Sequence, residues 1–96
     1  MNMVAQKQLD LFITELFGNG EILDVKGIYE LVITGYQNAK DCSMSCINER
    51  LEELKDTGIL LDEGSYFDDS GEQVSLYRIS ECGLDKLYNF LNRIQA

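Results

Sequence analysis

Hydrophobic positions in the first third of the chain repeat at the spacing of α-helices. Residues 4–17 carry one apolar stripe, formed by Leu9, Phe12, Ile13, Leu16 and Phe17. Residues 25–34 follow Asp24, a suitable N-cap, and their apolar face is formed by Ile28, Leu31 and Val32. Apolar residues three or four positions apart line one face of a helix, so both segments are predicted to be helical. Residues 21–23 between them fit a very short strand.

A third helical pattern ends where the period of the chain changes. Residues 43–56 place Met44, Ile47, Leu51 and Leu54 on one face, and Gly58 is a natural stop after them. Residues 59–67 and 73–79 have the character of strands, and the turn between them is Asp68-Asp69-Ser70-Gly71. The pattern therefore predicts a helix followed by a β-hairpin.

The end of the chain returns to the helical period. Ser80 is a suitable N-cap for a last helix, whose apolar stripe is formed by Leu84, Leu87, Tyr88, Leu91 and Ile94. Three helices followed by a two-stranded wing are the plan of a winged helix-turn-helix, an α+β fold that is mainly α. The 96 residues are enough for one such domain, so we predict a single winged-helix domain over residues 1–96 with an added C-terminal helix.

Two runs in the C-terminal half resemble PadR-like and MarR-like bacterial regulators. The run from Ile47 to Leu60 resembles the end of their recognition helix, with its Leu-x-x-x-Gly-apolar-apolar step into the wing. The run from Leu76 to Leu87 is similar to their Tyr-Arg-Leu-Thr-x-x-Gly-x-x-x-Leu strand and helix start. The resemblance implies a dimeric DNA-binding regulator, with the third helix in the major groove and the wing along the backbone or the minor groove.

The charge balance opposes DNA binding. The chain has 17 Asp and Glu residues against 8 Lys and Arg, which gives a net charge of −9. Nucleic-acid-binding proteins usually present a basic face, because neutralising phosphates supplies much of their affinity. The chain departs from the family pattern at two places. One is the acidic wing tip, residues 68–72, and the other is the outward face of the third helix, formed by Ser45, Glu49, Glu52, Glu53 and Asp56.

The candidate DNA contacts centre on the start of the third helix. Small polar side chains at a helix N-terminus can contact phosphates and base edges, and cations on the second helix and the wing can contact the backbone. The serines are equally well explained as helix caps, and isolated cations are more often solvated surface charges. The predicted set is Lys26, Lys40, Ser43, Ser45, Asn48 and Arg78.

The last helix is a candidate dimer interface. It has a continuous apolar stripe, although a domain of this size has little core left for a fourth helix to cover. A helix of this kind often packs against a second subunit, and the first helix is a further candidate for the same interface. We therefore expect a homodimer whose interface includes Leu84, Leu87, Tyr88, Leu91 and Ile94.

The sequence carries no strong catalytic or metal-binding motif. It lacks His, the commonest general base and metal ligand, and its three cysteines, Cys42, Cys46 and Cys82, are an odd number. Cys42 and Cys46 at a helix start would suit a redox switch, but small apolar side chains are the simpler interpretation. We expect no enzyme, no cofactor and no metal. Because no segment has the length of a membrane span or the form of a signal peptide, we expect a cytoplasmic protein that does not bind membranes.

Two functions from different classes remain open. The first is a sequence-specific DNA-binding protein that acts as a dimeric transcriptional regulator or operon-type adaptor. The alternative is an acidic winged-helix interaction module that binds a basic protein, or occupies a DNA-binding site in place of DNA, without binding DNA itself. The fold and the family resemblance favour the first, whereas the acidic third helix and wing tip favour the second.

Overall fold

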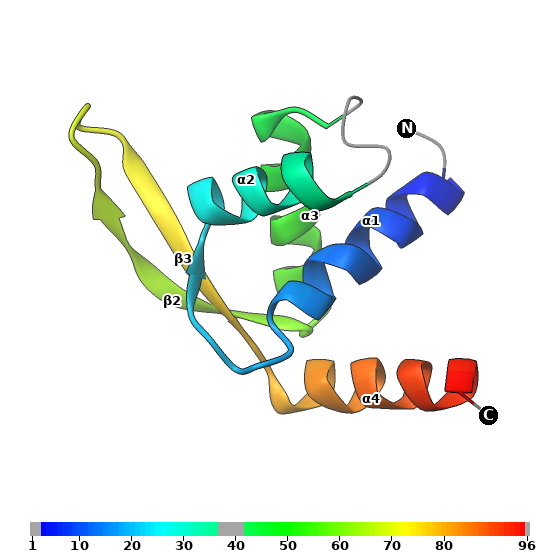
Figure 1. Ribbon diagram of the computed structural model, residues 1–96. Helices are drawn as coiled ribbons and strands as arrows, with labels where there is room; N and C mark the ends of the chain where they lie inside the picture. Colours follow the sequence, from blue (N-terminus) through cyan, green and yellow to red (C-terminus); the bar gives the residue numbers. More distant parts are fainter. Residues whose placement is uncertain (1–2, 37–41, 96) are drawn as a thin grey trace.

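The helices and strands follow the predicted order in the computed structural model (Figure 1). The structure describes the backbone of residues 3–36 and 42–95 and the side chains of residues 6–36 and 42–90. The elements are α1 (Met3–Leu16), β1 (Leu23–Asp24), α2 (Val25–Gly35), α3 (Met44–Asp56), β2 (Leu60–Phe67), β3 (Gln73–Ile79) and α4 (Glu81–Gln95). With α2 and α3 as the helix-turn-helix pair and β2–β3 as the wing, the predicted winged-helix fold is confirmed.

Side-chain caps explain where three of the helices begin. Asp24 Oδ1 accepts a hydrogen bond from the Gly27 amide at 2.6 Å and starts α2, while Ser43 Oγ accepts from the Cys46 amide at 3.0 Å and starts α3. Ser80 Oγ accepts from the Gly83 amide at 2.9 Å at the start of α4. Each cap satisfies an amide that the first turn of a helix leaves without a backbone partner. Asp24 and Ser80 are the caps that the sequence predicts.

The three strands form an antiparallel sheet in the order β1-β3-β2. The predicted short strand at residues 21–23 lies instead at Leu23–Asp24, where Leu23 pairs with Tyr77. The wing begins at the pair Leu60–Ile79 and extends away from the helices, as Figure 1 shows. A β-bulge between Asp62 and Ser65 interrupts its register. Gly64 within the bulge has φ = 98°, a backbone conformation that favours glycine.

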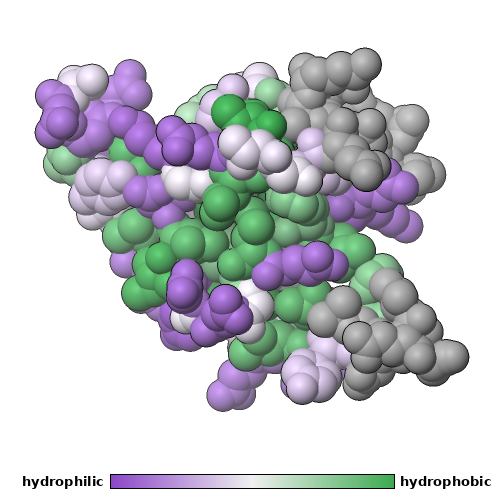
Figure 2. All heavy atoms as spheres, viewed as in Figure 1, coloured by the Kyte–Doolittle hydropathy of each residue, from purple (hydrophilic) through white to green (hydrophobic). Residues whose placement is uncertain are grey.

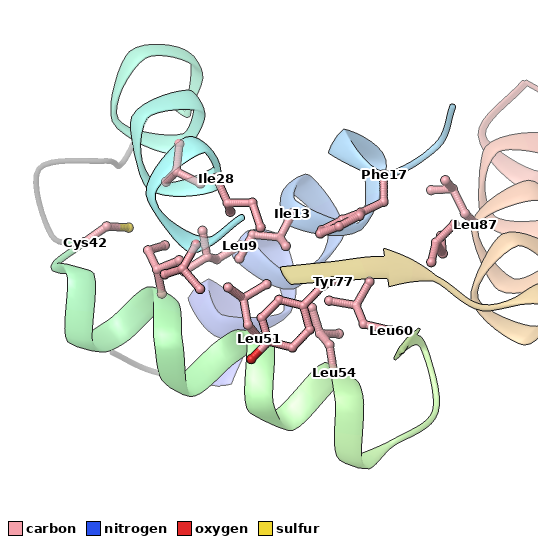
Figure 3. Close-up of a cluster of buried hydrophobic side chains, with 14 of the residues drawn as sticks. Leu9, Ile13, Phe17, Ile28, Cys42, Leu51, Leu54, Leu60, Tyr77 and Leu87 are labelled. Carbon is pink, nitrogen blue, oxygen red and sulfur yellow. The ribbon is translucent and has the colours of Figure 1, made fainter. Parts of the chain in front are cut away.

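The core lies where α1, α2 and α3 meet the root of the wing (Figure 3). The largest fully buried side chains come from all four of these elements: Phe17, Leu9, Ile13, Ile28, Ile47, Leu51, Leu60 and Val32. Two residues predicted to face the core do not. Leu31 is 43% exposed because the buried stripe of α2 runs through Val25, Ile28 and Val32, and Leu31 lies outside it. Met44 is 36% exposed because it occupies the first turn of α3, beside the wing.

The fourth helix covers the core with only one end. In Figure 1, α4 leaves the foot of β3 and extends below α1. Among its described side chains, Leu87 is buried, Leu84 is half-buried, and Tyr88 and Phe90 are exposed. Gly83 is also buried, because a Cβ at this position would lie 2.4 Å from the Ile59 carbonyl oxygen. Within the described part of the chain, none of the helices combines the length and the apolar character that crossing a membrane requires.

Candidate nucleic-acid interface

The start of α3 presents small polar side chains to solvent, as the sequence predicts. Ser43, Ser45 and Asn48 are all exposed. Ser43 also caps the helix, so its hydroxyl oxygen already accepts a backbone hydrogen bond. Asn48 and Lys26 lie along a small groove between the starts of α2 and α3 and the wing, which residues 72–75 complete. The structure therefore brings Asn48 and Lys26 together. Lys40, also predicted to bind DNA, lies outside the described residues.

Lys26 contacts the wing tip. Its Nζ forms an ion pair and a hydrogen bond with Asp68 Oδ2. This contact raises the pKa of Lys26 and, together with the amides of Glu72 and Ser70, lowers the pKa of Asp68. The ammonium group is thus close to a carboxylate, although the Lys26 side chain remains 49% exposed.

Arg78 is paired in a similar way on the wing. Its Nε donates a hydrogen bond to Glu63 Oε1 across the hairpin. The guanidinium of Arg78 therefore carries a carboxylate neighbour from the adjacent strand. Pairing with a carboxylate offsets part of the positive charge that would attract a phosphate group to Arg78.

The outward face of α3 is acidic. One shallow surface on this face is lined by Arg50 and by six other polar residues: Ser45, Asn48, Glu49, Glu52, Glu53 and Asp56. Glu52 Oε2 lies 2.8 Å from Lys55 Nζ, and Glu52 Oε1 accepts a hydrogen bond from the Tyr77 hydroxyl at 2.8 Å. The contacts with Lys55 and then Tyr77 lower the pKa of Glu52, which keeps this carboxylate ionised. The acidic face predicted from the sequence is confirmed.

Arg50 lies on the same helix, but its side chain is directed toward α1. Its Nε lies 2.9 Å from Asp10 Oδ1 of α1, in ionic contact without the geometry of a hydrogen bond. Burial raises the pKa of Asp10, and the charge of Arg50 opposes that rise. The Arg50 side chain is only 14% exposed. Arg50 therefore joins α3 to α1 and adds little positive charge to the outward face.

The positive charges of the described region are mostly neutralised where they lie. Lys26, Arg50, Lys55 and Arg78 each form an ion pair with an Asp or a Glu. Lys7 and Lys86, which form no ion pair in the described region, line a different groove between α1, α3 and α4. No basic strip therefore follows α3 and the wing among the side chains described. Figure 2 shows the wing tip as a hydrophilic projection and apolar residues across the middle of the same face.

The predicted dimer interface divides into three groups. Tyr88 is 69% exposed and Leu84 is half-buried, so both are accessible on α4. Leu87 is 7% exposed and packs near Gly18 at the end of α1, because the end of α4 closes the core of the single chain (Figure 3). Leu87 therefore belongs to the core of the single chain in the structure. The side chains of Leu91 and Ile94 lie outside the described part. Phe90, 39% exposed, is an apolar position on α4 that sequence reasoning missed.

The cysteines do not form a common site in the described residues. Cys42 is buried in the core, Cys46 is half-buried, and Cys82 is exposed on α4. Across the described ranges, no three Cys, Asp or Glu side chains gather in a way that could hold a metal ion. The burial of Cys42 agrees with its interpretation as a small apolar side chain.

Sequence reasoning missed the contacts that fasten the wing to α2. The Tyr66 hydroxyl donates to Asp24 Oδ2 at 2.5 Å, two residues along the wing from the Lys26–Asp68 pair. These partners are 42 positions apart in the chain. The only signal in the sequence was the placement of opposite charges at the start of one helix and at the tip of the turn, and this does not define a contact.

Comparisons with known proteins identify the fold. No protein-family profile matches the sequence, and no curated protein matches it. The crystal structure of a proposed transcriptional regulator from Thermoplasma acidophilum is similar, with a TM-score of 0.77 and 16% identity over 98% of this chain and 86% of that chain. A PadR-like transcriptional regulator from Bacillus cereus is similar with a TM-score of 0.69 and 16% identity, over 96% of this chain and 85% of that one. At this identity the likeness establishes a shared fold.

Proposed function

We propose that this chain is a DNA-binding transcriptional regulator or operon-type adaptor that acts as a homodimer. The observation that carries the proposal is that its fold matches proteins described as transcriptional regulators along nearly its whole length. The exposed polar residues at the start of α3 support it, because winged helices read the major groove with this part of the recognition helix. In this proposal Asn48 contacts base edges and Lys26 contacts the DNA backbone; the exposure of both residues along one groove supports these roles.

The proposed dimer rests on α4. Its exposed aromatic side chains, Tyr88 and Phe90, lie on a helix that covers the core with one end only. Phe90 also borders the groove between α1 and α4. A second copy that packs against these helices would bury this apolar surface and present two recognition helices. Reading a palindrome would require those helices to be about 34 Å apart, one turn of DNA.

DNA binding by titration of a labelled duplex tests the proposal. The probe is DNA from upstream of the protein's own gene, measured by fluorescence anisotropy at several salt concentrations. We expect salt-sensitive binding that Asn48→Ala weakens about tenfold, since a base contact is worth about 1–3 kcal/mol. Asn19→Ala, at an exposed position in the turn after α1, is the matched control and should bind as the wild type does. The absence of binding to any genomic fragment at low salt would refute the proposal.

A second candidate function is an acidic module that binds a basic protein. The specific observation in its favour is the acidic surface of α3, together with the pairing of Lys26 and Arg78 to carboxylates. Calorimetry with a purified basic partner tests it. Glu49→Lys combined with Asp56→Lys should abolish binding, whereas Glu15→Lys on the exposed side of α1 should not. If the partner still binds after this charge reversal on α3, the acidic surface of α3 is not the binding site.

A further inference from the structure

The wing is tied to the start of α2 by two polar contacts. The Tyr66 hydroxyl donates to Asp24 Oδ2, and the other oxygen of Asp24 caps α2 by accepting from the Gly27 amide. Two residues further along the helix, Lys26 is paired with Asp68 at the wing tip. Both ends of this connection are therefore fixed to structured elements. The contact between Lys26 and Asp68 is built into the fold and is not a chance meeting of two free side chains.

Asp68 is held in place by its own turn. Its Oδ1 accepts hydrogen bonds from the amides of Ser70 and Glu72, both at 2.9 Å, which leaves Oδ2 directed to Lys26. The Asp68 side chain is only 9% exposed, whereas that of Lys26 is 49% exposed. The carboxylate is thus a positioned anion, and the ammonium is the more accessible member of the pair.

We propose that Asp68 is an internal competitor for DNA phosphate at Lys26, so that the wing tip limits the protein's affinity for DNA. This inference rests on the proposed DNA-binding function. A carboxylate and a phosphate are both anionic acceptors for the same lysine ammonium, so phosphate gains Lys26 only by displacing Asp68 or by sharing the ammonium with it. Binding then exchanges one ionic contact for another and adds little net attraction.

The competition predicts a specific salt dependence. A lysine that contacts phosphate normally contributes about 0.9 to the slope of log K against log salt, through released counterions. Lys26 should contribute much less, because Asp68 already neutralises it. Asp68→Asn removes the charge but keeps an amide oxygen that can accept from Ser70 and Glu72, so the turn is preserved. This variant should therefore bind DNA more tightly, and its binding should depend more steeply on salt.

The matched control is Asp69→Asn. Asp69 is the next residue in the same turn and is exposed, and it forms no ion pair in the described region. Its substitution changes the net charge by the same amount at nearly the same place. Any general effect of a less acidic wing tip therefore appears in both variants, and the difference between them isolates the contact with Lys26.

The experiment titrates the same duplex with the wild type, Asp68→Asn and Asp69→Asn at several salt concentrations, with urea unfolding to verify that each variant is folded. We expect Asp68→Asn to bind about five- to tenfold more tightly, with a slope steeper by about 0.9, and Asp69→Asn to bind less than twofold more tightly. Equal gains in both variants would overturn the competition and leave the proposed function intact. No binding by any of the three proteins would overturn both.

A second measurement tests the ion pair without DNA. The carboxyl group of Asp68 is titrated by NMR in the wild type and in Lys26→Met. We expect the titration to move to higher pH in Lys26→Met, because the lysine contact that lowers the pKa of Asp68 is gone, while the amides of Glu72 and Ser70 still hold it below the ordinary value. An unchanged titration would show that Lys26 and Asp68 are not paired in solution and would overturn the inference.

Discussion

The two ends of the wing are held by different forces. At the root, Leu60 pairs with Ile79, both are buried, and Tyr77 packs in the core beside them. At the tip, Phe67 is 72% exposed, and the turn is fastened to α2 by Lys26 and Asp68. Burial of apolar surface stabilises the root, whereas an ion pair whose Lys26 side chain is 49% exposed contributes little to folding. The root therefore belongs to the core, and we expect changes of charge at the tip to leave the domain folded.

Two tyrosines, one at the root and one near the tip of the wing, form the same type of hydrogen bond in different surroundings. Tyr77 at the root donates to Glu52 of α3, and Tyr66 nearer the tip donates to Asp24 at the start of α2. Burial, followed by the contact with Glu52, raises the pKa of Tyr77 to about 12. The hydrogen bond to Asp24 is the main cause that raises the pKa of Tyr66. The same phenol–carboxylate contact thus joins the wing to a helix twice, once from a buried tyrosine and once from an exposed one.

The largest expected effect tests the root directly. Leu60→Ala should lower the free energy of unfolding by about 3 kcal/mol, because it removes a fully buried side chain and leaves a cavity. Leu61→Ala, one position further along β2 and 37% exposed, is the matched control and should cost less than about 1 kcal/mol. Urea denaturation measures both. Equal losses would mean that the root of the wing is not part of the core.

The next effect concerns the joint between the root and α4. Gly83→Ala should destabilise the protein by about 2 kcal/mol, because the added Cβ would lie 2.4 Å from the Ile59 carbonyl oxygen and 2.8 Å from Ile79 Cγ1. Thermal unfolding monitored by circular dichroism measures the loss. Cys82→Ala, at the neighbouring exposed position, serves as the control and should unfold close to the wild-type temperature. A wild-type melting temperature for Gly83→Ala would contradict the close packing of α4 on the wing.

A smaller effect separates the two tyrosines. Tyr77→Phe should lower the free energy of unfolding by about 1 kcal/mol, since it removes a hydrogen bond to a charged acceptor from a buried residue. Tyr66→Phe should leave stability unchanged within the precision of urea denaturation and should instead speed amide exchange in the wing turn. If Tyr66→Phe proves as destabilising as Tyr77→Phe, the distinction between root and tip fails.

A further effect appears only at high pH. Because the pKa of Tyr77 rises from 10.0 to about 12 on folding, its stabilising contribution is complete below pH 10 and is lost as the pH rises toward 12. The stability difference between the wild type and Tyr77→Phe should therefore shrink over this window. Absorbance of tyrosinate, recorded in parallel for the wild type and Tyr77→Phe, should show Tyr77 ionising well above pH 10. If the stability difference between the wild type and Tyr77→Phe stays constant from pH 9 to pH 12, the pKa of Tyr77 is not raised by folding.

Much of the fold was predictable because local signals agree with the packing. The change of period after Gly58 marks the step from α3 to the wing, and the caps Asp24 and Ser80 begin helices as expected. Three features depend only on neighbouring residues in the sequence: the residues of short turns, the alternation of polar and apolar residues in β3, and the apolar stripes of the helices. They can therefore be recognised without coordinates. The polar, exposed start of α3 was predictable for the same reason.

The contacts that decide the candidate site were not predictable. A charged residue such as Arg50 on a helix is normally expected to face solvent, yet its side chain is directed inward and pairs with Asp10 of α1. The sequence predicts Lys26 and Arg78 as phosphate contacts, whereas in the structure both are paired with wing carboxylates. These carboxylates lie far away in sequence or across the hairpin. Side-chain pairing of this kind depends on tertiary geometry. Leu87 is a further example, because a helical stripe does not reveal which of its residues reach the core.

The interrupted strand β2 also affects how copies of this protein meet. It forms one edge of the sheet, where unpaired backbone groups would otherwise offer a template for another strand. The bulge at residues 62–65, with Gly64 in the left-handed region, breaks that row into two short and misaligned pieces. Asp62 and Glu63 add like charges at the break. Edge-to-edge pairing of β2 with a strand from another copy is therefore disfavoured.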